Sequence, residues 1–150
     1  MLGHFALQCR CGPDLIVRYR SRISGPLLDR IDLHVEVPAL AAGDLEGASP
    51  GERSSGVRER VTRARNLALA RQGAPNARLS GGEIEARARP DPESMRLLRD
   101  ATSRMSLSAR ARHRVLKVAR TVADLDASDC VRSSHLAEAL RYRAVPPGAR

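Results

Sequence analysis

Residues 107–125 read LSARARHRVLKVARTVADL and form the longest helical pattern of the chain. Ser108 is a favourable N-cap, and the pattern after it predicts a helix that runs to about Leu125. The apolar residues that would share one face of this helix are Ala111, Val115, Val118, Val122 and Leu125. Such a stripe is typical of a helix that packs against other helices.

Capping signals predict further helices on both sides of this one. Ser80 and Glu83 have the spacing of a capping box, and Asp91 followed by Pro92 is typical of a helix start that would lead to about Met105. The other helices that we expect are one from Ser54 or Ser55 to about Gln72, with Val57, Val61, Ala64 and Ala68 on its buried stripe and Gly73 after its end, and one that opens at Ser133 or Ser134.

The composition also favours packed helices. The chain has 150 residues, of which 42% are hydrophobic and only 2% aromatic, with no Trp. A core must therefore be built from Leu, Val, Ile and Ala, which suits helices better than a sandwich of sheets. The length suits one domain or two small units.

A different pattern precedes the helices, in residues 24–38, which read SGPLLDRIDLHVEVP. The pair Gly25-Pro26 would break a helix that runs from Pro13 to Ile23. Apolar residues then alternate with polar ones from Ile31 to Val37, which predicts a strand with one buried face. A lone strand leaves backbone donors and acceptors without partners, so it would need a sheet from elsewhere.

The fold class that we expect is therefore mainly α, with two parts. A helix–turn–strand unit covers residues 1–38, a linker rich in small residues covers 39–53, and a bundle of helices covers 54–145.

The charge balance allows two interpretations. The chain has 26 Lys+Arg against 17 Asp+Glu, a formal net charge of +9, and Lys117 is its only lysine. The arginines could lie on solvated faces, or they could contact the phosphates of a nucleotide or a nucleic acid. A stand-alone basic helical module that binds DNA or acts as an adaptor is thus an alternative function. Against it, the sequence has no recognisable reading helix and few aromatic residues for base stacking.

The cysteines and the hydropathy pattern indicate a cytoplasmic protein. The chain has three cysteines, an odd number that does not suggest a disulfide framework. No segment has the length and apolar character of a membrane helix, and the start lacks the pattern of a signal peptide.

Four stretches, 9–11, 22–38, 107–125 and 135–143, occur in collinear order and together resemble the magnesium-chelatase-like AAA+ ATPases of the YifB/ComM type. The resemblance implies a protein that binds and hydrolyses ATP with Mg²⁺ as a homo-hexameric ring of neighbouring subunits. Members of this type are implicated in DNA branch migration during natural transformation. Residues 1–38 would be the end of the ATPase core, and residues 54–145 the C-terminal helical lid.

The resemblance assigns Arg30 as an arginine finger that completes the active site of a neighbouring subunit. A guanidinium suits this role because it is always charged and can fork across two γ-phosphate oxygens. The alternative is a surface arginine that pairs with Asp29 or Asp32, an interaction worth at most about 1 kcal/mol.

Within the longest helical pattern, the resemblance makes Arg110 the candidate sensor-2 residue, which would reach from the lid to the γ-phosphate. Positive charge is slightly unfavourable in a first helical turn, so the presence of Arg110 there suggests that it has a role. Arg114 lies on the same face and is a weaker candidate. The alternative for both is a solvated surface arginine.

Cys9 and Cys11 resemble the second half of a four-cysteine zinc knuckle of this family. Tetrahedral zinc takes four ligands, and here only two cysteines remain, with His4 as a possible third. The alternative, which we favour for this chain, is that Cys9 and Cys11 are reduced thiols that hold no zinc.

The sequence departs from the family in one important respect. Lys117 has no phosphate-cradling glycines before it, so there is no Walker A motif, and no apolar strand ends in an Asp-Glu pair that could be a Walker B motif. We therefore expect a fragment of an ATP hydrolase that does not turn over ATP alone.

Overall fold

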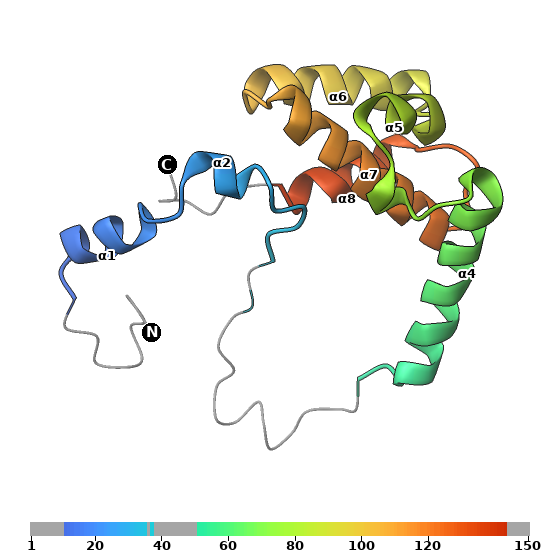
Figure 1. Cartoon of the computed structure of the whole chain (residues 1–150), viewed down its shortest axis with the longest axis horizontal. Helices are drawn as coiled ribbons and strands as arrows, with labels where there is room; N and C mark the ends of the chain where they lie inside the picture. The colour runs from blue at the N-terminus through green and yellow to red at the C-terminus, as the bar shows by residue number, and fades with distance from the viewer. Residues whose placement is uncertain (1–10, 36, 38–50, 144–150) are drawn as a thin grey trace.

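The computed structural model describes residues 11–35, 37 and 51–143, and these are helical with irregular connections (Figure 1). In chain order the elements are α1 (Pro13–Arg20), α2 (Gly25–Leu28), α4 (Ser54–Gln72), the 3₁₀ helix η1 (Asn76–Arg78), α5 (Gly81–Ala88), α6 (Pro92–Arg104), α7 (Ala109–Leu125) and α8 (Ser133–Arg141). The described ranges contain no strand, which confirms the mainly α fold class.

Helix α7 is the centre of the bundle. Helices α4, α5 and α8 pack against it, and α6 packs on α8. The core cluster contains only Leu, Ile, Val and Ala, with Ile84, Leu98 and Leu136 fully buried. The prediction of an aliphatic core is therefore confirmed. Figure 1 shows α4 projecting from one end of this bundle, with α1 and α2 at the other.

Three predicted caps, Ser80, Asp91 and Ser108, begin their helices as expected, whereas α4 begins at Ser54 after Arg53 and has no side-chain cap. Ser80 Oγ accepts a hydrogen bond from the amide of Glu83 at 3.3 Å, while the Glu83 carboxylate accepts one from the amide of Ser80 at 2.6 Å. Asp91 caps α6 by accepting from the amide of Ser94 at 2.7 Å. These backbone bonds hold the pKa of both carboxyl groups below its usual value. The starts of α5 and α6 are thus specified by their own local residues.

The predicted strand over Ile31–Val37 is not formed in the residues that the structure describes there, 31–35 and 37. No other strand is available in the described chain to pair with it. The amide of His34 instead donates to the carbonyl of Tyr142 at 2.8 Å. The first helix is also shorter than expected, because it ends at Arg20, and Gly25-Pro26 begins α2 rather than only breaking a helix.

Two predicted buried stripes differ from those observed. In α4, Ala64 and Ala68 are buried, but Val61 is 52% exposed and lines a hollow beside Leu125 of α7. In α7 the buried face is turned toward Leu116 and Ala119, whereas Leu125 is exposed. The stripe expected for α7 included Ala111 but not the buried Ala119 and Ala123, because the small side chain of alanine gives only a weak hydropathy signal.

A buried polar cluster joins α4 and η1 to α7. Asp124, whose side chain is 2% exposed, accepts a bidentate pair from Arg71 at 2.6 and 2.8 Å. Its carboxylate also accepts from Asn76 Nδ2 at 2.8 Å and from Arg120 Nη2 at 2.9 Å. The buried Arg120 guanidinium donates further to the carbonyl of Asp129 at 3.0 Å. Every charge in the cluster therefore has a partner.

The cluster sets the protonation of Asp124. Burial desolvates the carboxylate and by itself raises its pKa. The hydrogen bonds from Arg71 and Asn76, together with the charge of Arg120, outweigh this and hold the pKa of Asp124 below its usual value. The carboxylate is therefore charged wherever the bundle is folded near neutral pH.

Replacement of Asp124 should strongly destabilise the bundle. Asp124→Ala leaves the buried Arg120 and the half-buried Arg71 without their carboxylate, which we expect to lower the free energy of unfolding by about 3 to 5 kcal/mol. Urea denaturation followed by circular dichroism measures the loss. Asp100→Ala, at an exposed position of α6, is the matched control and should change the free energy by about 0.5 kcal/mol or less. A loss below about 1 kcal/mol for Asp124→Ala would contradict the role of the cluster.

The same carboxylate should make stability depend on pH in acid. Because its folded-state pKa lies below its unfolded value, its contribution is present above about pH 3.9 and disappears as the pH falls through the folded value. Urea unfolding between pH 6 and pH 3 should therefore show a steeper loss for the native chain than for Asp124→Asn. Glu83 and Asp91 titrate in both proteins and cancel in the difference. Parallel curves would show that Asp124 contributes no such linkage.

Candidate functional site

The predicted finger, Arg30, lies on the tight turn that follows α2, and we define residues 25–32, α2 included, as the Arg30 turn. The amide of Ile31 donates to the carbonyl of Leu28 at 3.1 Å, and so closes the turn. The Arg30 side chain is exposed, and its guanidinium donates to the carbonyl of Pro26 at 3.1 Å. It forms no ion pair within the described residues.

Asp29 is held by Arg143 and Ser108 and not by Arg30. Its Oδ1 accepts from Arg143 Nη2 at 2.7 Å, and its Oδ2 accepts from Ser108 Oγ at 3.1 Å. Arg143, only 5% exposed, also donates to the carbonyl of Ile31 at 2.7 Å. The charge of Asp29, one of the two acids beside Arg30, is therefore neutralised by Arg143.

Asp32, the second acid beside Arg30, forms an ion pair with Arg114 of α7. The alternative in which Arg30 pairs with Asp29 or Asp32 thus does not describe the structure. Arg114, the weaker of the two candidate nucleotide-binding residues of α7, is thus already paired with an acid. Its neighbour on the helix face, Lys117, donates to the carbonyl of Ala77 at 3.1 Å.

Arg110, the predicted sensor-2 residue, is exposed in the first turn of α7. Within the described ranges it has no hydrogen-bond or ion-pair partner, in contrast to Arg112, which pairs with Glu85 at 2.6 Å. The Ser108 cap orients the helix start by accepting from the amide of Ala111 at 3.1 Å. Arg110 is thus a cation whose position is fixed by its backbone and whose guanidinium is available for a ligand.

A groove of ≈ 560 Å³ runs between the Arg30 turn and the loop before α7. Asp29 and Leu28 line it on one side, and Leu107 and Ser108 line it on the other, with Arg143 between them. Neither Arg30 nor Arg110 is among the residues that line this groove.

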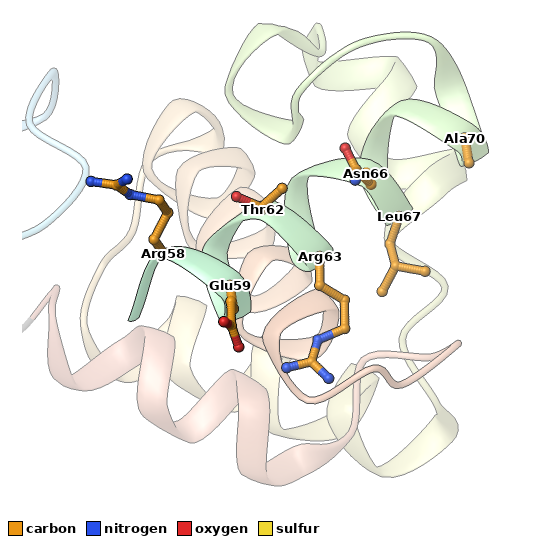
Figure 2. A pocket seen from close by; sticks show the side chains of 7 residues that line it. All are labelled: Arg58, Glu59, Thr62, Arg63, Asn66, Leu67 and Ala70. Atoms are coloured by element: carbon orange, nitrogen blue, oxygen red, sulfur yellow. The ribbon is translucent and has the colours of Figure 1, made fainter. Parts of the chain in front are cut away.

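A second hollow, of ≈ 640 Å³, lies on the solvent face of α4 (Figure 2). Figure 2 shows that Arg58 points away from the other labelled side chains, among them Thr62 and Asn66. None of the predicted site residues lines this hollow.

The zinc prediction stays a prediction. Cys9 and His4 lie outside the described residues, whereas Cys11 is described and is half-buried. Across residues 11–35, 37 and 51–143, no three His, Cys, Asp or Glu side chains are grouped as a metal site would require.

A search of the same described ranges for membrane spans finds no helix with enough apolar length to cross a bilayer.

Comparison with known families decides the relationship. The model described as magnesium chelatase, subunit ChlI C-terminal, matches residues 51–143, and the model of magnesium chelatase, subunit ChlI, matches residues 1–45. The chain belongs to the magnesium chelatase ChlI family. The resemblance drawn from the sequence is therefore confirmed, and with it membership of an AAA+ ATPase family.

Three relatives show how far the similarity extends. The competence protein ComM of Haemophilus influenzae is 43% identical over 145 residues, which is 95% of this chain and 28% of ComM. YifB of Salmonella typhimurium is 44% identical over 137 residues, 91% of this chain and 27% of YifB. The protein Mb2921c of Mycobacterium bovis is 40% identical over 146 residues, 95% of this chain and 28% of its own length. The chain thus spans little more than a quarter of these relatives.

The sequence did not indicate that Arg143 holds the turn that carries Arg30. Arg143 closes the last family stretch, but an arginine after a helix end is favourable in any protein and gives no special signal. Its partner Asp29 lies 114 residues away in sequence, so no local pattern could join them.

Proposed function

We propose that this chain supplies the arginine-finger end and the helical lid of a ring-forming AAA+ ATPase, a homo-hexamer that hydrolyses ATP with Mg²⁺ and acts on DNA. The observation that carries the proposal is the state of Arg30. Its guanidinium is exposed, while the two aspartates that flank it are neutralised by Arg143 and Arg114. Its charge is therefore available to a ligand outside the chain.

An exposed arginine on a fixed turn suits a finger that acts in trans. The developing charge on a transferred phosphoryl group needs a cation that is already in place, and an arginine can meet two oxygens at once. No phosphate-binding motif accompanies Arg30 in this sequence. A γ-phosphate bound by a neighbouring subunit is thus the ligand that its position favours.

Arg110 supports the same proposal from the lid. It is a cation in a first helical turn, where positive charge costs free energy unless an anion is present. Being exposed and without a partner in the described ranges, it fits a phosphate of ATP. The described residues offer no group of ligands for Mg²⁺, so the metal and the phosphate loop would come from the rest of the ring subunit.

The substrate that we propose for the ring is DNA. The formal net charge of +9 favours contact with phosphates, and the similar protein of Haemophilus influenzae is named a competence protein. The isolated chain would hydrolyse no ATP, because its sequence has no Walker A motif.

Arg30→Ala tests the finger. The chain is fused to ComM of Haemophilus influenzae in place of the stretch that it matches, so that the rest of ComM would supply the Walker motifs. We expect kcat for ATP to fall by about 1,000-fold or more, because an arginine finger contributes about that much. The matched control is Arg58→Ala, an exposed arginine on α4.

Mixed rings then separate action in trans from action within one subunit. Arg30→Ala subunits are mixed with subunits whose P-loop lysine is replaced. If the finger acts in trans, mixed rings regain turnover, because intact Arg30 side chains meet intact ATP sites. Full activity of Arg30→Ala rings, or no recovery on mixing, would overturn the assignment.

Arg110→Ala tests the lid residue in the same fusion. Loss of a charge-assisted hydrogen bond to phosphate should lower kcat/KM for ATP by about 10- to 100-fold. Arg99→Ala, on the exposed side of α6, should leave it unchanged. Equal values for the two variants would show that Arg110 contacts no nucleotide.

A further inference from the structure

We propose that Arg143 is a positioning residue, which fixes the turn that carries Arg30 to the lid of the same subunit. The proposal rests on the proposed function of Arg30 as a finger. Arg143 itself is too deeply buried, at 5% exposure, to reach a nucleotide.

The contacts of Arg143 enclose the finger on both sides. Its guanidinium donates to the Asp29 carboxylate at 2.7 Å, just before Arg30, and to the carbonyl of Ile31 at 2.7 Å, just after it. A longer bond reaches the carbonyl of Leu28 at 3.4 Å. One planar group with several fixed donors thus restrains the backbone carbonyls of Leu28 and Ile31 and the side chain of Asp29, on both sides of Arg30.

Further contacts tie the same segment to the lid. Ser108, the cap of α7, donates to the second oxygen of Asp29 at 3.1 Å, and Arg114 of α7 pairs with Asp32. The amide of His34 donates to the carbonyl of Tyr142 at 2.8 Å. The turn is therefore held by the start of α7 and by the residues after α8. Figure 1 shows α2 close to this end of α8.

These contacts connect the candidate sensor-2 residue, Arg110, with the turn that carries the candidate finger, Arg30. Arg110 lies two residues after Ser108, in the helix turn whose cap contacts Asp29. A shift of α7 on contact between Arg110 and a phosphate would therefore move the Arg30 turn with it. Arg110 would thus contact the nucleotide of its own subunit, and the resulting movement of α7 would reposition Arg30, which acts on the nucleotide of the neighbouring subunit.

The first experiment asks whether Arg143 holds the turn, and it uses the 150-residue chain. Hydrogen exchange should show the His34 amide at least about 10-fold less protected in Arg143→Ala than in the native chain. Arg141→Ala, an exposed neighbour on α8, is the matched control and should leave protection unchanged. Protection of Ala119 in α7 reports whether the bundle stays folded.

Asp29→Asn is the second variant in case Arg143→Ala unfolds the bundle. It breaks the same ion pair from the exposed side of the turn and leaves α8 intact. Unchanged protection of the His34 amide in Asp29→Asn and in a folded Arg143→Ala would overturn the proposal.

The second experiment asks whether Arg143 acts through Arg30, in the ComM fusion described above. We expect Arg143→Ala to lower kcat by about 100-fold, as a misplacement of about 1 Å can do, with KM for ATP unchanged. Arg143→Lys should restore part of the loss, because it keeps the charge but lacks the fork.

A double-variant cycle distinguishes positioning from general stability. In the Arg30→Ala background, Arg143→Ala should cause no further loss of kcat, since there is no finger left to position. An equal loss in both backgrounds would overturn the positioning role while the finger assignment stands. If Arg30→Ala alone leaves kcat unchanged, the finger assignment fails, and the positioning role fails with it.

Discussion

The buried carboxylate of Asp124 is the constraint on which the bundle depends. Helix α4 offers α7 little apolar surface, chiefly Ala64 and Ala68, and two alanines cannot hold a helix of 19 residues by burial alone. The bidentate bond from Arg71 and the contact through Asn76 supply what the apolar contact lacks. Because a buried ion without its partner is costly, we expect the cluster to favour this register of α4 against α7 over others.

Polar contacts also join the N-terminal part to the bundle, and its apolar side chains remain uncovered. Leu15 is 58% exposed, Val17 62% and Leu33 49%. Many large apolar side chains exposed within one segment are unusual for a surface that faces water alone. They agree with the proposal that this part continues the core of a larger ATPase subunit, whose sheet would cover them.

The sequence predicted α5, α6 and α7 well because each begins with its own capping residue. The Ser80–Glu83 box and the Asp91 cap act within one turn, so local residues were enough. Prediction failed where the partner is distant or missing. The strand over Ile31–Val37 has no strand beside it in the described chain, and the core face of α7 depends on alanines whose role only packing reveals. Arg30 and Arg110 came from the family resemblance, whereas the occupation of Asp29 by Arg143 required the three-dimensional arrangement.

The bond between Asp29 and Arg143 has a consequence for how such chains evolve. The linker between the two parts is an inviting point for recombination, because its residues are small and its composition is simple. Yet a crossover in the linker would separate Asp29 from its ion-pair partner Arg143, which lies 114 residues later. A hybrid would work only if both parents use the same pair. We therefore expect the two parts to be inherited together, with an altered residue at one position accompanied by a compensating change at the other.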